Sequence, residues 1–420
     1  MAPFAAVELD VSDVAGAIVL AGLATADGDH VLATYDAARG QVGVEVRRGG
    51  RTRQVRRRKV TLTAAFRFAF ALCENQVTVL ADTGDGWQPL MTERKRVARH
   101  VDLRDPSTLA QFRYAWGATS PGAPSAETPS AAASGAELSV VRAGPFGMAG
   151  IRDPHLVQHA DGTPYVRDGK AYLTATCAGL GFFQQAHWGV FTLDLADPTR
   201  LEQVAQLYSL RDGLLLGDHA GQLVRDEDRW IVAVTSWGDF TPKGGVHVRH
   251  TTSGADLLSG VHVLETEPAP LPTTVGAWDP ALTRIDGRWH VAFVESPSQK
   301  PFDFHPALAV ADGPGWTDGL RPVGAATDMH MCEGPIVARL DGRWALLASD
   351  GERREYPVFD LQMRRAGSLD APYGTNLPHP QVVPLPDGGH LLVTFDGTQY
   401  GEQVLGYGGH GDVVVMRSRR

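Results

Sequence analysis

The chain has 420 residues, of which 43% are hydrophobic and 21% charged, as in ordinary globular proteins. This length exceeds a single ordinary core, so we expect one large repeat architecture and a smaller domain. The formal net charge of −9 disfavours nucleic-acid and anionic-membrane partners, because both attract a basic surface.

The cysteines and the start of the chain bear on cellular location. Cys73, Cys177 and Cys332 lie far apart and form no CxxC pair, so neither a zinc site nor a disulfide framework is predicted. Scattered thiols are typical of a reducing compartment. The first residues contain no basic segment followed by an apolar one, which is the pattern of a signal peptide. We therefore expect a cytoplasmic protein without a membrane partner.

Residues 1–117 are predicted to form an N-terminal β-sandwich. Short runs such as VGVEVRR and NQVTVLADT alternate apolar and polar residues, and Gly- and Asp-rich turns separate them. Several short strands at this spacing favour a sandwich with a structural or accessory role, and such a domain could mediate a homodimer. The arginine-rich run 47–59 is interpreted as a solvated hairpin.

Residues 118–135 read ATSPGAPSAETPSAAASG and carry a single charged side chain. This Ala, Ser and Pro composition offers too little apolar surface for a packed core, so a linker is predicted. It divides the chain into the N-terminal domain and a second domain over residues 136–420.

The second domain contains a fivefold repeat. Each segment has an acidic or His-bearing turn, an apolar strand, an Asp- or Gly-containing turn and a second apolar strand. The segments recur roughly every 45 to 65 residues, a period typical of β-propeller blades. An all-β, five-bladed β-propeller is therefore predicted. The residues that lead the five segments are Asp153, Asp218, Asp279, Glu333 and His379.

The leading acids are candidates for catalysis. In a propeller the first strand of each blade lines the central channel, so leading residues that are distant in sequence converge on one place. Cleavage of a glycosidic bond needs two carboxyl groups, one that protonates the leaving oxygen and one that acts on water or on the sugar. A third carboxylate can raise the pKa of the acid. Asp153, Asp279 and Glu333 supply three such groups.

Three motifs carry a resemblance to a known family. The strings RDP (152–154), WDP (278–280) and CEGP (332–335) resemble the active-site strands of glycoside hydrolase family 43 and its relatives. The resemblance covers residues 136–420 in blade order. It implies a five-bladed propeller that cleaves arabinofuranosides or xylosides with inversion, with Asp153 as general base, Asp279 as pKa modulator and Glu333 as general acid.

The resemblance also suggests a cation. Family members often hold one in the channel through a His of the last blade and through waters, and His379 occupies the matching place. Calcium would suit the water and oxygen ligands of such a site. A His between two prolines is equally consistent with a structural turn residue.

Further side chains near the leading positions are candidates for sugar binding. Trp278 adjoins Asp279 and is the favoured stacking platform, and His155, two residues after Asp153, is expected on the same strand face. For Asp218 and the lone histidines, a structural role is a competing interpretation. The full candidate set comprises Trp278, Asp218, His219, His155, Trp237 and His330.

We predict a glycosidase that releases a pentofuranosyl or xylosyl-type unit from the end of a small oligosaccharide or glycoside. Two alternatives remain. The RDP string and the Cys-Glu pair also resemble family 32, the retaining fructofuranosidases, although motif order and the Cys-Glu orientation differ from that family's pattern. The second alternative is a carbohydrate-binding propeller without catalysis, because a fold does not determine function.

Overall fold

The computed structural model describes residues 3–14, 16–62, 65–120, 136–181, 183–241, 243, 245–374, 377–398 and 411–418. The described chain is all-β, with only α1 (Pro106–Leu109) and two 3₁₀ turns, η1 (Val97–Arg99) and η2 (Phe183–Gln185), as helical elements. None of these is long and apolar enough to cross a membrane. Two compact units are present. Unit 1 spans 3–147 and 212–216, and unit 2 spans 148–211 and the described residues from 217 onwards.

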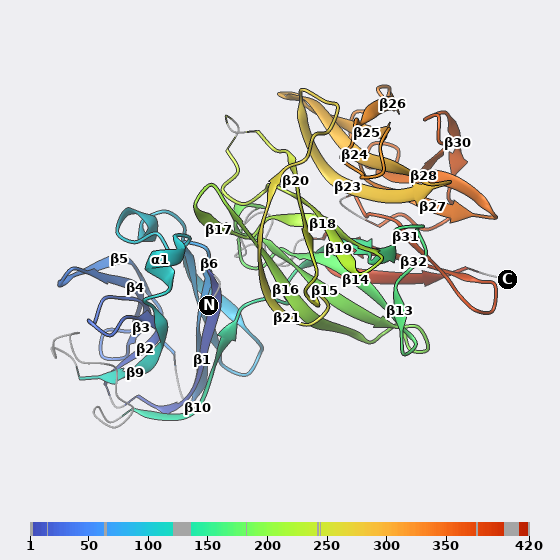
Figure 1. Cartoon of the computed structure of the whole chain (residues 1–420). Helices are drawn as coiled ribbons and strands as arrows, with labels where there is room; N and C mark the ends of the chain where they lie inside the picture. Colours follow the sequence, from blue (N-terminus) through green and yellow to red (C-terminus); the bar gives the residue numbers. More distant parts are fainter. Residues whose placement is uncertain are drawn as a thin grey trace. The chain divides into compact units, whose positions relative to one another are not determined.

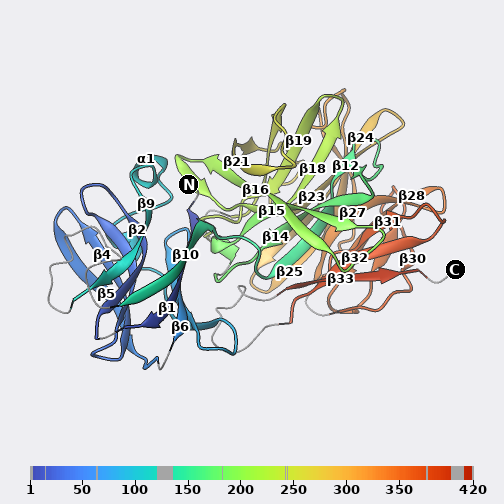
Figure 2. The same cartoon turned by 90° about the horizontal axis from the view of Figure 1, so that it is seen from below.

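Unit 1 consists mainly of two antiparallel sheets (Figures 1 and 2). The first has the order β10-β1-β6-β7-β8, with β1 (Phe4–Asp13), β6 (Phe66–Cys73), β7 (Gln76–Asp82), β8 (Gln88–Glu93) and β10 (Glu137–Pro145). The second has the order β5-β4-β3-β2-β9, with β2 (Ile18–Ala24), β3 (His30–Asp36), β4 (Gln41–Arg48), β5 (Arg51–Lys59) and β9 (Arg113–Thr119). The short strand β17 (Leu214–Leu216) lies in the second segment of this unit.

Two predictions about this region can be compared with the structure. The arginine-rich run forms the exposed edge strand β5, whose only buried residue is Val55, in agreement with a solvated hairpin. The domain boundary differs from the predicted one. β10 forms an antiparallel pair with β1 and so belongs to unit 1. Of the predicted linker 118–135, residues 121–135 lie outside the described residues.

The described strands of unit 2 form five sheets, here called sheets I to V in chain order, with β12 and β21 exchanged between sheets I and II (Figure 1). Sheet I contains β11 (Ile151–Leu156), β13 (Val166–Arg167), β14 (Lys170–Cys177), β15 (His187–Asp194), β16 (Leu201–Arg211) and β21 (Gly260–Glu265). Sheet II contains β12 (Gln158–His159), β18 (His219–Asp226), β19 (Arg229–Thr235), β20 (Val248–Ser253) and β22 (Glu267–Pro268).

The last three sheets are simple antiparallel meanders. Sheet III contains β23 (Gly276–Ile285), β24 (Arg288–Gln299), β25 (Phe302–Val310) and β26 (Arg321–Ala325). Sheet IV contains β27 (Cys332–Leu340), β28 (Arg343–Asp350), β29 (Pro357–Phe359) and β30 (Arg365–Ser368). Sheet V contains β31 (Gln381–Pro384), β32 (His390–Asp396) and β33 (Asp412–Arg417).

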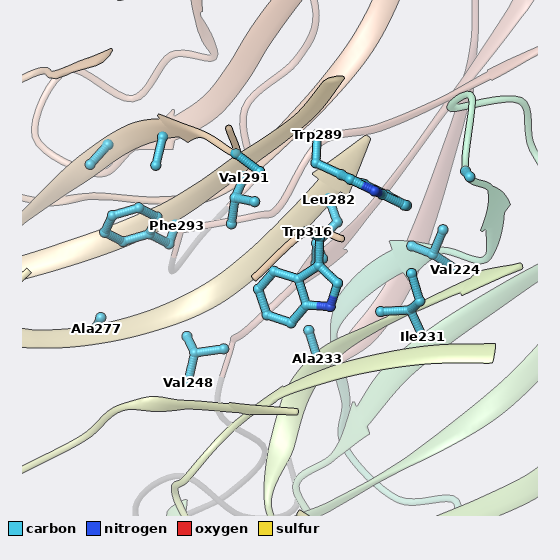
Figure 3. Close-up of a cluster of buried hydrophobic side chains, with 14 residues drawn as sticks. Val224, Ile231, Ala233, Val248, Ala277, Leu282, Trp289, Val291, Phe293 and Trp316 are labelled. Carbon is cyan, nitrogen blue, oxygen red and sulfur yellow. The ribbon is translucent and has the colours of Figure 1, made fainter. Parts of the chain in front are cut away.

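Each sheet packs on the next through a buried apolar cluster. The cluster between sheets II and III includes Trp289 and Trp316 together with Val224 and Ile231 (Figure 3). Similar clusters join sheets I and II, III and IV, and IV and V. A further cluster joins sheet V back to sheet I, where Val383 and Val393 pack with Leu156 and Leu173. The packing therefore closes from the last sheet to the first.

Glutamine side chains also join neighbouring sheets, in the same way for sheets II and III as for sheets V and I. The Oε1 atom of Gln222 in β18 accepts the Leu282 N–H of sheet III at 2.7 Å. The Oε1 atom of Gln381 in β31 accepts the Leu156 N–H of sheet I at 2.9 Å. Because both bonds are buried, each satisfies a backbone donor that would otherwise be costly to bury. The last sheet thus meets the first in the way that sheet II meets sheet III.

Candidate active site

Four titratable side chains meet where the first strands of unit 2 lie closest together. Asp153 lies in β11, Asp279 in β23 and Glu333 in β27, and His379 precedes β31. The Nε2 atom of His379 is 3.9 Å from Asp153 Oδ1, 3.5 Å from Asp279 Oδ2 and 3.7 Å from Glu333 Oε1. The three carboxyl groups that the sequence singled out therefore surround one imidazole.

The same irregularity occurs in β11, β18, β23 and β27, and it sets the direction of these side chains. The strand register shifts at Asp153 in β11, and likewise at Ala220 in β18, at Asp279 in β23 and at Gly334 in β27. These four residues have positive φ angles of 48°, 51°, 50° and 64°. Such bulges redirect side chains and are frequent beside active sites. The bulge equivalent to Asp153 in sheet II is therefore Ala220 and not Asp218, which had aligned with it in sequence.

Second-strand threonines of one sheet support the bulge of the next. The hydroxyl oxygen of Thr176 in β14 accepts the Ala220 N–H at 3.2 Å. The hydroxyl oxygen of Thr235 in β19 accepts the Asp279 N–H at 3.1 Å. These bonds satisfy the backbone donors that the register shifts remove from the strand ladder. Thr176 also hydrogen bonds the Asp153 carboxylate.

Gly334 lets His379 approach the acids. A Cβ atom built on Gly334 would lie 2.4 Å from Cγ and Cδ2 of the His379 ring, which is far inside contact distance. The positive φ of Gly334 is a second reason for glycine at this position. Its N–H donates to Asp279 Oδ2 at 3.1 Å. The EGP string therefore serves packing and hydrogen bonding in addition to carrying Glu333.

The charges of the cluster are divided unequally. Burial opposes ionisation of Asp153, but His379 and Arg152 outweigh this effect and lower the pKa of Asp153 below its ordinary value. Burial raises the pKa of Asp279 well above its ordinary value, and the nearby Glu333 adds to the rise. The pKa values of two carboxyl groups in similar positions are thus shifted in opposite directions, a pattern typical of sites in which two acids have different roles.

The imidazole of His379 is the cation of the cluster. Burial disfavours its charged form, but Asp279 and Glu333 raise the pKa of His379 to about 9. A protonated imidazole therefore balances negative charge at neutral pH in a site that has little contact with solvent.

We expect His379→Gln to flatten the alkaline part of the stability profile. A pKa raised from 6.5 to about 9 stabilises the fold fully below pH 6.5, and this contribution is lost as the pH rises through about 9. Denaturant unfolding between pH 6 and 9.5, a range chosen around those two pKa values, should show a smaller decline for the variant than for the unchanged protein. His330→Gln, at an exposed imidazole, is the control. Equal declines in all three proteins would refute this role.

Trp278 holds the carboxylate of Glu333. Its Nε1–H donates to Glu333 Oε2 at 3.1 Å, and its ring is only 2% exposed. A buried ring cannot offer a face to a sugar, so the interpretation of Trp278 as a stacking platform is corrected to one of positioning. Phe302 stacks on it with ring centroids 5.9 Å apart, and Phe302 is 51% exposed. The exposed aromatic face beside Glu333 is therefore that of Phe302, which sequence patterns did not mark.

If the protein is a glycosidase, as its sequence motifs suggest, Trp278→Phe is expected to lower kcat roughly tenfold on glycosides with poor leaving groups, because it removes the N–H donor that orients Glu333. The loss should be smaller on activated aryl glycosides, which need less assistance from Glu333. Trp289→Phe is the control, since it removes a buried N–H donor (to Pro314 O) between sheets II and III. A similar loss in both variants would point to general destabilisation.

Two other predicted sugar ligands have their polar atoms engaged by the protein. Asp218 is fully buried, and its carboxylate accepts two bonds from Arg211 at 2.7 and 2.8 Å and one from the Gly238 N–H at 2.9 Å. This geometry favours a structural role over substrate contact. His219 is buried as well, with Nδ1 3.3 Å from the Thr176 hydroxyl and Nε2 3.1 Å from the Phe183 carbonyl oxygen. Burial lowers the pKa of His219 to about 4.

The remaining candidates lie in three different environments. His155 does not share the face of Asp153, because the bulge reverses the strand alternation on which that prediction depended. It lines a cavity beyond the acids. Trp237 is partly buried in an aromatic cluster with Trp278. His330 is exposed, and its Nδ1 atom lies 3.2 Å from Oδ1 of Asp303. Asp303 and Phe302 are neighbours in β25.

Asp279, Glu333 and His379 could also bind a metal, because one ligand atom from each lies within 4.8 Å of the others. Calcium usually takes six to eight oxygen ligands. Direct coordination here would offer two carboxylate groups and one nitrogen, and that nitrogen is protonated at neutral pH by its raised pKa of about 9. These residues do not fit a directly bound calcium ion.

Comparisons with known proteins identify similar structures. No family model and no curated protein sequence matches the chain. The GH43_1 enzyme of Xanthomonas citri has 17% identity and a TM-score of 0.44 over 63% of this chain and 88% of that chain. An α-L-arabinofuranosidase of Lactobacillus brevis has 14% identity and a TM-score of 0.45 over 64% and 91%.

A Penicillium chrysogenum α-L-arabinanase, solved with arabinobiose, has 10% identity and a TM-score of 0.40 over 84% of this chain and 90% of that chain. Family 43 glycoside hydrolases, which the sequence motifs resemble, are thus among the similar structures. Identities and TM-scores this low carry no inference about the reaction, which has to be argued from the residues themselves.

Proposed function

We propose that unit 2 is a five-bladed β-propeller and that unit 1 is an accessory β-sandwich. Apart from the exchange of β12 and β21, the five sheets of unit 2 follow one another along the described chain, and each packs on the next. The cluster between sheets V and I and the repeated glutamine bonds support closure of the ring. First strands that surround a common axis place Asp153, Asp279 and Glu333 together.

We propose that the protein is a glycoside hydrolase. The observation that carries this proposal is the convergence of three carboxyl groups on His379, with all three within 4 Å of one nitrogen. Asp153, whose pKa is lowered, is suited to activate a water molecule as general base. Glu333 is the most exposed of the three and is oriented by Trp278, which suits a general acid.

Asp279 completes the proposed machinery without contacting the water or the leaving group. Burial raises the pKa of Asp279 well above its ordinary value, so it ionises less readily than Asp153, whose pKa is lowered. Its Oδ2 atom accepts the Gly334 N–H, which fixes the chain next to Glu333. The imidazole of His379, whose pKa is raised to about 9 by Asp279 and Glu333, supplies a positive charge between the three carboxyl groups.

The substrate is proposed to be a pentofuranosyl or xylosyl-type glycoside, cleaved from a chain end with inversion. The resemblance of the RDP, WDP and CEGP motifs to family 43 supports this choice. Hydrolysis of aryl α-L-arabinofuranoside, β-D-xyloside, β-D-galactofuranoside and fructofuranoside tests it. ¹H NMR of the first-formed sugar anomer tests inversion. Activity only on the fructofuranoside, with retention, would favour the family 32 alternative, and no activity on any sugar would favour a binding propeller.

Phe302 is proposed as the aromatic platform for the leaving-group sugar. Its exposed ring lies against Trp278, beside the general acid. Phe302→Ala should raise KM for oligosaccharides several-fold, since it removes the apolar ring surface that a sugar face would cover. It should change KM for small aryl glycosides less. Phe304, in the same strand but buried, provides the matched control as Phe304→Leu.

No step of this proposal uses calcium. An effect of calcium through bound waters would appear as loss of activity on chelation and recovery on addition of the ion. A cytoplasmic location and a homodimer remain predictions that cell fractionation and sedimentation would test.

A further inference from the structure

A second cavity lies in unit 2, further along the same first strands. Its volume is about 730 Å³, within the range of about 300–1,000 Å³ that small-molecule sites occupy. Residues of all five sheets line it, among them His155, Gln158, Arg284, Ala338 and Gln381. His155, Arg284, Ala338 and Gln381 lie in the four sheets that carry the catalytic cluster. Each follows its sheet's member of the catalytic cluster by two to five positions in the sequence. Since a strand rises about 3.3 Å per residue, the cavity lies beyond the acids and not around them.

Two buried nitrogen atoms at this cavity have no hydrogen-bond partner among the described residues, Nε2 of His155 and Nε2 of Gln381. Gln381 is only 1% exposed, and its Oε1 atom is engaged by the Leu156 N–H. Burial lowers the pKa of His155 to about 4, so its ring is neutral and can donate or accept a hydrogen bond. Both nitrogen atoms are closed off from solvent, so a ligand in the cavity would meet the other polar groups of the lining.

The charges of the lining are nearly balanced. Three carboxylates, of Asp161, Asp286 and Asp341, and two guanidinium groups, of Arg284 and Arg339, line the cavity. Arg284 is also paired with Asp226 at 3.2 Å. A lining with little net charge favours neither a strong anion nor a strong cation. It offers many donors and acceptors, which suits a ligand rich in hydroxyl groups.

Trp344 adds an apolar surface to this polar lining. One side of the residue packs on the core between sheets III and IV. Its ring also contacts the turn at Gly162, where an added Cβ atom would lie 2.8 Å from Cη2. Both residues line the cavity. An aromatic ring next to hydroxyl-binding groups matches the two faces of a sugar, one apolar through its C–H groups and one polar.

We propose that this cavity is a second binding site, separate from the catalytic cluster, for a neutral mono- or disaccharide. The ligand's hydroxyl groups would bond the charged groups of the lining, those of Asp161, Asp286, Asp341 and Arg339, and one sugar face would lie on Trp344. Binding here does not require that the protein hydrolyse anything, so this site and the proposed function are tested by different measurements.

The test is ¹⁹F NMR of protein labelled with 5-fluorotryptophan, titrated with xylose, arabinose and galactose. Trp344→Phe identifies the Trp344 signal among those of the nine tryptophans. The Glu333→Gln protein excludes turnover. We expect the Trp344 signal to shift saturably with at least one sugar, with a dissociation constant of about 1–10 mM. Hydrolysis of aryl glycosides, measured separately, reports only on the catalytic cluster.

Two variants distinguish the cavity from other sites. Ala338→Phe fills it and should abolish the shift of Trp344, whereas signals of Trp237 near the acids should still respond to a sugar that binds there. Arg339→Gln, at an exposed rim position, should weaken binding about fivefold without affecting the fold. Thermal unfolding verifies that both variants fold. Absence of a saturable Trp344 shift with all three sugars, or a shift that persists in Ala338→Phe, would overturn the proposal and indicate a water-filled channel.

Discussion

Glu333→Gln is expected to lower kcat/KM on glycosides with poor leaving groups about 10²- to 10⁴-fold, the usual contribution of a general acid. Gln has the shape of Glu and can still accept the Trp278 N–H, but it has no proton to give to the leaving oxygen. Glu333 is suited to this role because it is the most exposed of the three carboxyl groups and is oriented by the Trp278 N–H.

The measurement compares an unactivated disaccharide with a 2,4-dinitrophenyl glycoside of the same sugar. The dinitrophenolate leaves without protonation, so the variant should lose far less activity on it. Glu352→Gln, an exposed carboxyl group just beyond the second strand of the same sheet, is the matched control and should behave as the unchanged protein. An equal loss on both leaving groups would contradict the assignment of Glu333 as general acid.

Asp153→Asn is expected to lower activity by a similar factor, but on both kinds of leaving group. A general base activates the attacking water, and every leaving group requires that step. The lowered pKa of Asp153 means that the group is ionised at neutral pH, which is the state that accepts a proton. Asn also tolerates the positive φ of 48° at this bulge better than most residues, so the strand should be preserved.

Azide provides the discriminating readout for Asp153→Asn, because an anion needs no base to act as a nucleophile. Added azide should restore turnover of the dinitrophenyl glycoside and give a glycosyl azide of inverted configuration. Asp168→Asn, at an exposed turn with a φ of 52°, controls for the substitution itself. An azide product of retained configuration would contradict this role, because it requires two displacements and therefore a covalent glycosyl-enzyme intermediate formed by another carboxylate. An inverted azide would also form if Asp153 were a nucleophile, and the anomer first released by the unchanged protein distinguishes that case.

Parts of the site were predictable because they depend on local sequence. The repeated turn and strand pattern identified the leading residues, and the three acids among them, Asp153, Asp279 and Glu333, do converge. The inter-sheet packing of Trp289 also follows from its place in an apolar second strand. Such features need only the two-residue period of a strand and the recurrence of turns.

Other features depended on tertiary structure. Asp218 matched Asp153 in sequence, but the structural equivalent is Ala220, because a bulge adds a residue whose position has no signature in composition. The bulge at Asp153 in β11 directs His155 away from the acids. The contact between Trp278 and Glu333 results from packing between sheets III and IV. The exposed ring of Phe302 stacks on Trp278, a contact that the sequence did not indicate.

The sequence by itself determined an all-β chain, its repeats and the three carboxyl groups, since alternation and turn chemistry are local properties of the chain. Only the tertiary structure decided which side chains face one another, and with them the protonation of the site. The pKa values of Asp279 and His379 are set by burial and by neighbours more than 40 residues away in sequence, so only the folded arrangement specifies them.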